Sequence, residues 1–562
     1  MPWLTEISIR TFGYISTWYA LALLLPLAFA PSTLATNRSA AAFAREDTPS
    51  LCSKCHAEIV ASYAKTAMAH ASGLASADPI QGEFSHRVSG VDYRIEKQTD
   101  GLWLRFDRRG VPQLHGKRKF LYYIGCGKLK GRTYLFQVDQ FLFESPINWY
   151  AQRRLWDMTP NYEHATEAPL NLPALPECLN CHASEVKLPK AGTHNLYPEP
   201  AFAHSGISCE RCHGPSLDHA LHGSKIMSID KLPPDRRDAI CIQCHLEGNA
   251  TVERPHRHVY DFVPGDDLSD FVRYFVLVNN TGERGVSQFE ALAQSRCKKE
   301  SGDKMTCTTC HDPHNEPTQA EVAGYFRQKC ISCHGAFFAN RHHPENLNCV
   351  GCHMPSQPAT DVSHTEVTDH RILRDPSRVR GRAQSSADIE LQPFPVNPET
   401  NGDVRDLALA YESLVERGKR EVADKAESLL KQADQLDPTD APVATALGYI
   451  AQERGDLRVS RQYYEQALQG DSTNEEAANN LAVIEAGEGH LQRAVSLWQA
   501  VFNQAPWRSS VGINIALAFC SANRYEIARE YLVRVQEFNP DSSAARSLVN
   551  RLSAEHPECS IQ

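Results

Sequence analysis

The sequence lacks three features that mark common classes of protein. Only one long apolar run occurs, at Tyr14–Ala30, and no second run of about 20 residues follows it, which excludes a protein with several membrane spans. Positive charge is not in excess, with 58 Lys and Arg against 68 Asp and Glu, and this disfavours nucleic-acid binding. No βαβ pattern surrounds the paired cysteines, so a thioredoxin-like redox domain is not expected. With 562 residues, 42% of them hydrophobic, the chain should form several globular domains.

The N-terminal apolar run is typical of an export signal. Arg10 precedes the run, and small residues follow it around Thr33 and Ala35, as a signal peptidase requires. An uncleaved anchor is the alternative, but Pro26 and the shortness of the run disfavour a stable membrane helix. We therefore predict a signal peptide at residues 1–35 and a periplasmic or otherwise exported protein with no integral membrane segment after cleavage.

Cysteine is abundant, and its spacing is regular. The pattern C-x-x-C-H occurs seven times and uses 14 of the 18 cysteines. In chain order, these motifs are Cys52, Cys55 and His56; Cys178, Cys181 and His182; Cys209, Cys212 and His213; Cys241, Cys244 and His245; Cys307, Cys310 and His311; Cys330, Cys333 and His334; and Cys349, Cys352 and His353. We call them motifs 1 to 7.

This motif is the attachment site of haem c. Two thiols add to the vinyl groups of the haem, and the adjacent histidine ligates the iron. Zinc would require paired knuckles with four ligands and no histidine at a fixed place, and structural disulfides would not require the histidine at all. The sequence therefore predicts seven covalently attached haems, with the motif cysteines as thioether sites and the motif histidines as proximal ligands.

The seven motifs, together with CHGP at Cys212–Pro215 and CHDPH at Cys310–His314, make the chain resemble the multihaem c-type cytochromes. The resemblance is to the cytochrome c-554-like and hydroxylamine-oxidoreductase-like group and covers about residues 50–370. It implies a haem-packed domain in which histidines near one motif often ligate the iron of a neighbouring haem. It also keeps an enzymatic role open, because that group uses one open-faced haem among closed ones.

The second axial ligand of each iron must come from elsewhere in the chain. Of 24 histidines, seven are proximal, and His490 and His556 lie far downstream. The best candidates by position are His70, His219, His314 and one of His364 and His370. A second set has weaker positions: His86, His115, His164, His194, His204, His222, His256, His258, His342 and His343. Methionine is disfavoured because only six occur, and the supply of histidine permits seven closed haems or one five-coordinate haem.

Six of the seven proximal histidines lie within residues 182–353, too short a segment for a large apolar core, so the haems themselves must form the core. Between motifs 1 and 2, alternating stretches around Asp100-Gly101 and around Lys128–Gly131 predict an antiparallel β insert at about 84–150. The aromatic stretch Ser145–Tyr162 at its end is predicted to pack the insert against the haem core, with a haem-pocket lining as the alternative.

Four cysteines lie outside the motifs: Cys126, Cys297, Cys520 and Cys559. For Cys126 and Cys297, three hypotheses remain open: a disulfide between them in an oxidising compartment, a thiolate haem ligand, or free buried thiols.

The C-terminal part repeats every 34 residues. Turns recur at Pro438, Ser472, Pro506 and Pro540, and small residues recur at the helix-packing positions. This period is typical of tetratricopeptide repeats. We predict a seven-haem cytochrome domain at 36–370, a polar linker at 371–403, and a repeat domain at 404–562 of about four repeats and a capping helix. The fold class is thus mainly α: an irregular haem-packed domain with a β insert, followed by an α-solenoid.

The charge is uneven, because residues 401–562 carry 16 Lys and Arg against 24 Asp and Glu. An acidic solenoid favours a basic protein partner, unless the charge serves solubility alone. The leading hypothesis is an electron-transfer protein that docks a redox partner through its repeats. The alternatives are a multihaem reductase or dehydrogenase for a small nitrogen or sulfur compound, and an assembly protein with structural haems. No residue can be assigned a catalytic role, so enzymatic activity stays undecided.

Overall fold

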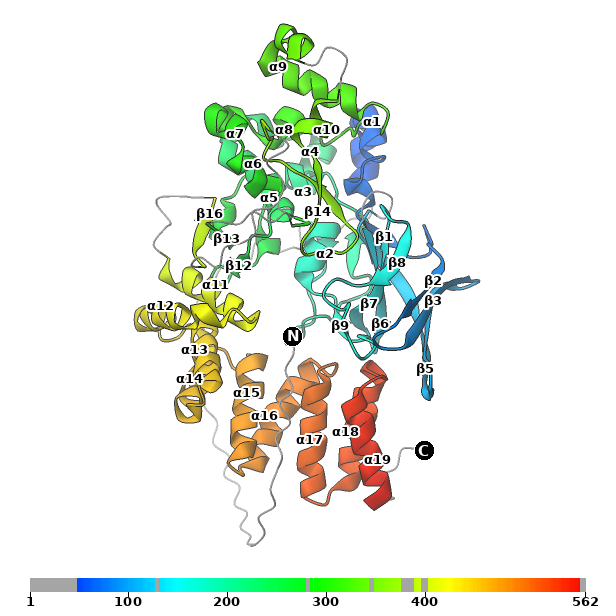
Figure 1. Cartoon of the computed structure of the whole chain (residues 1–562), viewed down its shortest axis with the longest axis vertical. Helices are drawn as coiled ribbons and strands as arrows, with labels where there is room; N and C mark the ends of the chain where they lie inside the picture. The colour runs from blue at the N-terminus through cyan, green and yellow to red at the C-terminus, as the bar shows by residue number, and fades with distance from the viewer. Residues whose placement is uncertain are drawn as a thin grey trace. The chain divides into compact units, whose positions relative to one another are not determined.

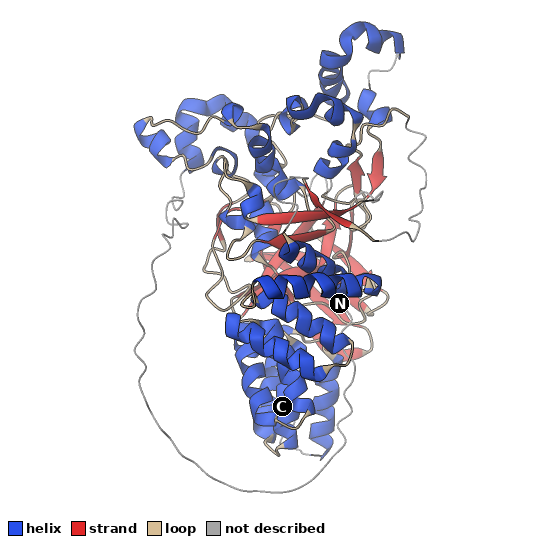
Figure 2. Cartoon of the chain, turned by 90° about the vertical axis from the view of Figure 1, so that its left-hand side faces the viewer, coloured by secondary structure: helices blue, strands red, loops and turns tan. Residues whose placement is uncertain are grey.

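The computed structural model describes residues 48–126, 131–278, 284–286, 288–342, 348–375, 389–395 and 403–555. The predicted signal peptide lies outside these residues. Figure 1 shows three regions along the chain: the strands that follow α1 (Thr48–Tyr63), the short helices α2–α10, and the paired helices from α11 onward. Figure 2 shows the same division by type of secondary structure.

An antiparallel sheet of nine strands lies between motifs 1 and 2. Strands β2 to β8 follow one another in chain order across the sheet, while β1 pairs with β5 and β9 pairs with β7. The strands are β1 (Ser72–Leu74), β2 (Gly82–His86), β3 (Val91–Gln98), β4 (Gly101–Arg108), β5 (Val111–Ile124), β6 (Gly131–Val138), β7 (Phe141–Tyr150), β8 (Leu155–Met158) and β9 (Leu172–Pro173). The sheet extends beyond the predicted insert at both ends.

Alternation of residues explains the sheet. In β3, the apolar residues Val91, Tyr93 and Ile95 are buried and alternate with polar ones. Strand β4 pairs antiparallel with β3, and at the turn end of the pair Gln98 lies opposite Gly101. The hairpin predicted around Asp100 is therefore confirmed. The second predicted pair corresponds to β5 and β6, whose connecting residues 127–130 lie outside the described part. The aromatic residues of β7 and β8 pack within this sheet, as when Trp156 stacks on Tyr134.

The motif-bearing region consists of short helices joined by irregular segments. Its α-helices are α2 (Pro176–His182), α3 (Glu210–His213), α4 (Leu217–His222), α5 (Pro234–His245), α6 (Gln288–Gln294), α7 (Arg296–Ser301), α8 (Cys307–Cys310), α9 (Val322–His342) and α10 (Cys349–His353). Single 3-10 turns are η1 (Met68–His70), η2 (Ile229–Lys231), η3 (Val259–Asp261), η4 (Leu268–Asp270) and η5 (Gly302–Lys304). Small sheets pair β10 (Ser184–Val186) with β11 (Phe202–His204), and β14 (Ser356–Pro358) with β15 (Glu366–Thr368).

The C-terminal helices form four antiparallel pairs and a final helix. The pairs are α11 (Val404–Glu416) with α12 (Ala423–Leu436), α13 (Ala441–Glu453) with α14 (Leu457–Gly470), α15 (Glu475–Gly487) with α16 (Leu491–Gln504), and α17 (Ser509–Ser521) with α18 (Tyr525–Phe538); η8 (Arg420–Val422) precedes α12, and α19 (Ser543–Glu555) follows. Small residues allow close packing: the position of Gly448 lies directly against the Tyr464 ring. These helices form the predicted α-solenoid, and the predicted fold class is confirmed.

The last repeat completes the core of the sheet. The Phe538 side chain at the end of α18 is fully buried, and its ring centroid lies 5.8 Å from those of Phe141 and Phe143 on β7. Beside it, the Arg108 guanidinium on β4 contacts the fully buried Asp541 carboxylate at 2.7 Å. The solenoid and the sheet therefore share one hydrophobic cluster.

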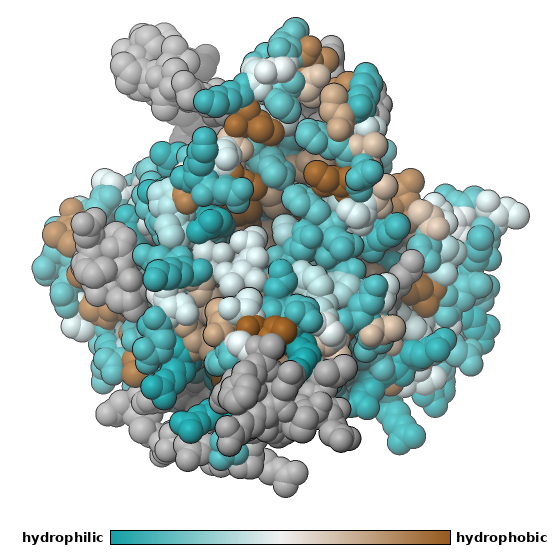
Figure 3. All heavy atoms as spheres, turned by 90° about the horizontal axis from the view of Figure 1, so that it is seen from above, coloured by the Kyte–Doolittle hydropathy of each residue, from teal (hydrophilic) through white to brown (hydrophobic). Residues whose placement is uncertain are grey.

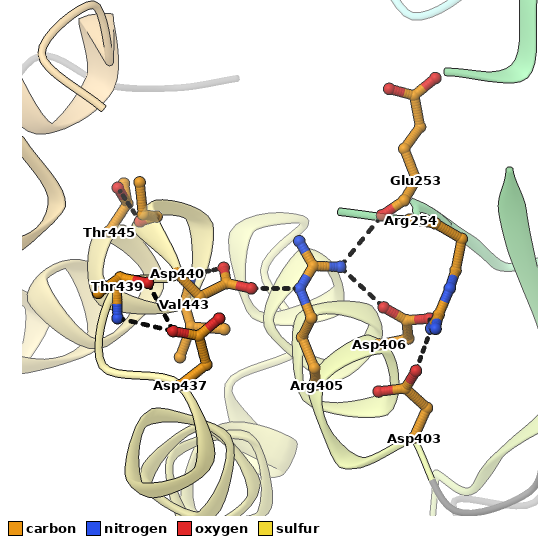
Figure 4. A network of polar contacts seen from close by, with 11 residues as sticks. Glu253, Arg254, Asp403, Arg405, Asp406, Asp437, Thr439, Asp440, Val443 and Thr445 are labelled. Atoms are coloured by element: carbon orange, nitrogen blue, oxygen red, sulfur yellow. Dashed lines mark hydrogen bonds and ion pairs between the residues drawn. The ribbon is translucent and has the colours of Figure 1, made fainter. Parts of the chain in front are cut away.

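The first repeat is fixed at a second place. A three-stranded sheet of β12 (Ala250–Glu253), β13 (Val272–Leu277) and β16 (Leu391–Phe394) packs against α11. Figure 4 shows the polar network at this junction: Arg405 donates to the backbone oxygen of Glu253 at 3.1 Å, and Arg254 pairs with Asp403 and Asp406. Because β16 lies inside the segment predicted as a linker, that segment is partly a strand of the haem-binding region.

No helix in the described part of the chain is long and apolar enough to cross a membrane.

Candidate functional site

Each of the seven motifs lies on or next to a helix. Motif 1 is on α1, motif 2 on α2, motif 3 on α3, motif 4 at the end of α5, motif 5 on α8, motif 6 on α9 and motif 7 on α10. A helical turn brings two cysteines three residues apart to one face, as attachment to one haem edge requires. Directly after the histidines of motifs 3 and 6, the chain has a glycine with a positive φ, Gly214 (φ 74°) and Gly335 (φ 69°), which a residue with a side chain rarely adopts.

Three motif histidines face a second histidine from outside the motifs. The ring centroids of His56 and His219 are 6.5 Å apart, with an interplanar angle of 21°. Those of His213 and His314 are 5.8 Å apart. Two imidazoles that bind one metal from opposite sides, each through a bond of about 2 Å, have centroids roughly 6 Å apart. Each pair is therefore spaced to ligate a single iron.

The third such pair joins motif 5 to a residue near the last motif. The centroids of the His311 and His370 rings are 6.2 Å apart, with an interplanar angle of 26°. Of the two candidates after motif 7, His370 thus faces a proximal histidine. In all three pairs, the second histidine faces a motif other than the one that it follows in the chain.

Hydrogen bonds fix the orientation of several of these rings. Nδ1 of His219 contacts the Ser224 carbonyl oxygen at 2.7 Å, and Nδ1 of His370 contacts that of Thr368 at 2.9 Å. The proximal His353 makes the same contact with Leu373 at 2.6 Å. A carbonyl oxygen only accepts, so Nδ1 carries the hydrogen in each case and Nε2 keeps the lone pair that a metal needs.

The surroundings of the motif histidines favour the neutral imidazole, which is the metal-binding form. Burial lowers the pKa of His182 to about 4, and burial together with the nearby His370 lowers that of His311 to about 4. Burial also lowers the pKa of His245, although its side chain is accessible to solvent.

Apolar side chains near the first pair also fit a haem. Ile59 on α1 and Leu221 on α4 belong to contacting helices and are 46% and 48% exposed. Figure 3 shows hydrophobic residues in a recess among hydrophilic ones on the face that it presents. A flat apolar macrocycle covers such side chains. The thiols, imidazoles and apolar walls of this region thus fit covalently attached haem.

The structure brings thiols of different motifs together. Cys52 of motif 1 interacts with Cys209 of motif 3, and burial raises the pKa of both thiols. Further interacting pairs are Cys181 with Cys244, Cys212 with Cys244, Cys241 with Cys307, Cys310 with Cys333, and Cys330 with Cys349. The attachment points of neighbouring haems therefore adjoin, and their order in space differs from their order in the chain.

Several other candidate histidines have protein partners instead. Nε2 of His364 contacts the Asp157 carboxylate at 2.7 Å, so in this structure it faces β8 rather than a motif histidine. His70 ends the turn η1 and is exposed. Within the second set, both ring nitrogens of His86 are hydrogen-bonded, to Ser89 and to the backbone of Glu163. His204 contacts Glu185, His194 contacts Glu475, and His258 contacts Glu253.

Cys126 and Cys297 form no disulfide among the residues that the structure describes, so the paired hypothesis for them is not supported. Cys297 lies near the thiols of Cys310 and Cys333 in motifs 5 and 6, and burial raises its pKa. Cys559 lies outside the described residues.

Haem-attachment motifs on short helices, facing imidazoles and a solenoid of helix pairs define a multihaem c-type cytochrome joined to a tetratricopeptide repeat domain. Two family models match within it: "Cytochrome c554 and c-prime" at residues 151–214 and "Doubled CXXCH motif" at residues 300–339. The multiheme cytochrome MtrA of Shewanella baltica is 26% identical over 209 residues, which are 33% of this chain and 62% of the relative. The chain thus spans less than two thirds of that relative's length.

Two solved structures each match little more than a quarter of the chain. PilF of Pseudomonas aeruginosa is 25% identical and covers 27% of this chain and 71% of its own, with a TM-score of 0.25. MamA of Desulfovibrio magneticus is 16% identical and covers 28% of this chain and 88% of its own, also with a TM-score of 0.25. The repeat assignment rests on the helix pairs and their 34-residue spacing in this chain rather than on these overlaps.

Proposed function

We propose that the protein is an exported heptahaem c-type cytochrome that carries electrons along its haems and docks a protein partner through its repeat domain. The observation that carries this proposal is the set of three facing histidine pairs on motifs whose thiols adjoin one another. When bound, each haem supplies an iron that takes up and returns one electron. Two imidazoles on one iron close it to substrates, which suits electron transfer.

The proposed site assigns a role to each residue. All fourteen motif cysteines form thioethers, and all seven motif histidines are proximal ligands. His219 is the distal ligand opposite His56, His314 opposite His213, and His370 opposite His311. His70 stays a candidate for one of the other four irons. The Nδ1 hydrogen bonds of His219 and His370 hold their rings so that Nε2 points at the metal.

The solenoid is proposed to bind a basic redox partner. Glu412 and Glu416 lie on α11 of the first repeat, and Glu476 lies on α15 of the third. Burial, and then repulsion from neighbouring carboxylates of this group, raises the pKa of Glu412 and of Glu416. A lysine- or arginine-rich surface would relieve this repulsion, and the association would weaken with salt. Export is proposed from the N-terminal apolar run and from the oxidising compartment that haem c attachment uses.

A multihaem oxidoreductase that acts on a small nitrogen or sulfur compound is the second candidate. The observation that favours it concerns His182. Burial, and then the charge of a nearby histidine, lowers the pKa of His182, and that nearby histidine is His245 of motif 4 rather than one from outside the motifs. An iron at motif 2 without a distal histidine would leave an open face.

Spectroscopy of the purified holoprotein separates the two functions. Mass spectrometry should first give seven haems per chain. Purely low-spin ferric EPR signals and no change in the Soret band on adding CO after reduction are expected for the electron-transfer protein. A high-spin signal with a CO-shifted Soret band would instead favour the enzyme, and fewer than seven haems would overturn the heptahaem assignment.

A further inference from the structure

The thiols of motif 4 lie near thiols of three other motifs, because Cys244 interacts with Cys181 of motif 2 and with Cys212 of motif 3, and Cys241 interacts with Cys307 of motif 5. Toward motif 2, the Cys181 thiol interacts with Cys244 and also donates to the backbone oxygen of Gln243 at 3.8 Å. Motifs 2 and 4 are therefore in direct contact, although motif 3 lies between them in the chain.

Motif 3 is hydrogen-bonded to motifs 2 and 4 through the side chain of Arg211. Arg211, inside motif 3, donates from Nη2 to the Gln243 side-chain oxygen of motif 4 at 2.8 Å and to the Asn180 backbone oxygen of motif 2 at 3.2 Å. Asn180 and Gln243 are both buried. A charged donor that links two buried acceptors makes strong, directional bonds, so Arg211 sets the spacing of three motifs.

Motif 5 meets motif 4 on the other side. The Cys241 and Cys307 thiols interact, and the backbone N–H of Cys307 donates to Asp238 Oδ1 at 3.3 Å. Asp238 is buried on α5, one turn before Cys241, and Lys298 Nζ lies 3.7 Å from its other carboxylate oxygen. Asp238 thus anchors the start of motif 5 to the helix that carries motif 4.

Further contacts between thiols extend this series of adjacent motifs on both sides. Motif 3 adjoins motif 1 through Cys209 and Cys52, motif 5 adjoins motif 6 through Cys310 and Cys333, and motif 6 adjoins motif 7 through Cys330 and Cys349. Cys55 and Cys352, in motifs 1 and 7, are exposed, whereas motif 2 is enclosed because Cys178 packs against the sheet.

We propose that the haem at motif 4 is a three-way junction, with arms through motifs 3 and 1, through motif 2, and through motifs 5, 6 and 7. Arg211 and Asp238 are the positioning residues of this junction. Each transfer oxidises one ferrous iron and reduces its ferric neighbour, with no other bond or proton change. The inference rests on the proposed electron-transfer function and adds that electrons from either exposed end can reach the enclosed haem at motif 2 through a single site.

The test uses His245→Met in the full-length holoprotein. Methionine ligation raises the potential of that iron, so it is reduced first in a mediated titration. EPR at that stage should show three ferric haems that have lost magnetic coupling to a neighbour, those of motifs 2, 3 and 5. Loss of coupling at two haems would overturn the junction, because haems that follow chain order give motif 4 only two neighbours.

Two milder variants test the positioning residues. Arg211→Gln should change the EPR couplings of the haems at motifs 2, 3 and 4, and Asp238→Asn should change those at motifs 4 and 5, with seven haems still attached. Arg236→Gln, on the same helix but paired with Asp267, is the matched control and should leave the spectrum unchanged. An Arg211→Gln spectrum identical to that of Arg236→Gln would overturn the role of Arg211.

The same samples separate this inference from the proposed function. Seven haems by mass, with only two partners for the haem at motif 4, would overturn the junction and leave electron transfer standing. Fewer than seven haems in the unmodified protein would overturn the heptahaem proposal itself. Should His245→Met fail to accumulate, Cys178→Ser with Cys181→Ser removes one arm, and unchanged coupling at motif 4 would then overturn the junction.

Discussion

At the scale of single residues, the facing rings of His56 and His219 show how the two proposed ligands of one iron come from distant segments. His219 follows motif 3, on α4, yet its ring faces the histidine of motif 1 on α1. Its Nδ1 is held by the Ser224 carbonyl, which leaves little freedom for the ring to turn. The protein alone therefore orients the proposed ligand.

His219→Ala should convert one haem from low to high spin, because water or an empty position replaces an imidazole. Ferric EPR should gain one high-spin signal out of seven haems, and added imidazole should reverse the change. His222→Ala is the matched control, since His222 lies on the same helix and is exposed. Equal spectra for the two variants would show that His219 is not a ligand.

The sequence predicts the attachment residues but not these pairings. A C-x-x-C-H motif is local, so its chemistry follows from five consecutive residues. The partner of His56 depends on how α1 and α4 meet, which no local pattern encodes. Arg211 and Asp238 were missed for the same reason, because the contacts of both side chains depend on how segments distant in the sequence meet.

At the scale of elements, the solenoid shows which helices and strands a sequence repeat predicts and which it does not. A 34-residue repeat of turns and small residues predicts its helix pairs, because each pair packs against the next pair in the same way. Strand β16 was not predicted, since four residues that include Pro393 give too short an alternation. Phe538 fits the repeat pattern as a core residue, and nothing in the sequence indicates that it also packs against β7.

The solenoid should become less stable as pH rises. Burial, and then repulsion from Glu416 and Glu476, raises the pKa of Glu412 to about 9, above its value of about 4.3 in an unfolded chain. Between these values the unfolded state releases the proton and the folded state keeps it, so each rise in pH favours unfolding. The unfavourable contribution is absent below about pH 4 and complete above about pH 9.

Glu412→Gln should therefore raise the melting temperature by a few degrees at pH 8 and leave it unchanged at pH 4. Far-UV circular dichroism across this pH range measures the effect. Glu421→Gln is the matched control, since Glu421 is exposed on η8 near the same helix. A gain of the same size at both pH values would mean that charge on Glu412 is not the cause.

At the scale of the whole molecule, the solenoid is held to the haem-binding region at both of its ends. Arg254 and Arg405 link α11 to β12, while Phe538 and Asp541 link the last repeat to β7 and β4. Between these ends, His194 contacts Glu475 at 3.1 Å. A repeat domain fixed in this way would hold the proposed partner in a constant position relative to the haems, which distance-dependent electron transfer requires.

Because the solenoid is attached at both ends, we predict that the solenoid and the sheet unfold together. Thermal unfolding of the holoprotein, followed by the Soret band and by far-UV circular dichroism, should give coincident transitions. Phe538→Ala removes a fully buried ring, costs about 3–5 kcal/mol of unfolding free energy, and should lower both transitions. Val533→Ala, on the same helix with Val533 36% exposed, should lower neither by a comparable amount. A Phe538→Ala protein whose far-UV transition falls while its Soret transition stays would mean that the repeats fold apart from the cytochrome, and the partner would then be held on a movable arm.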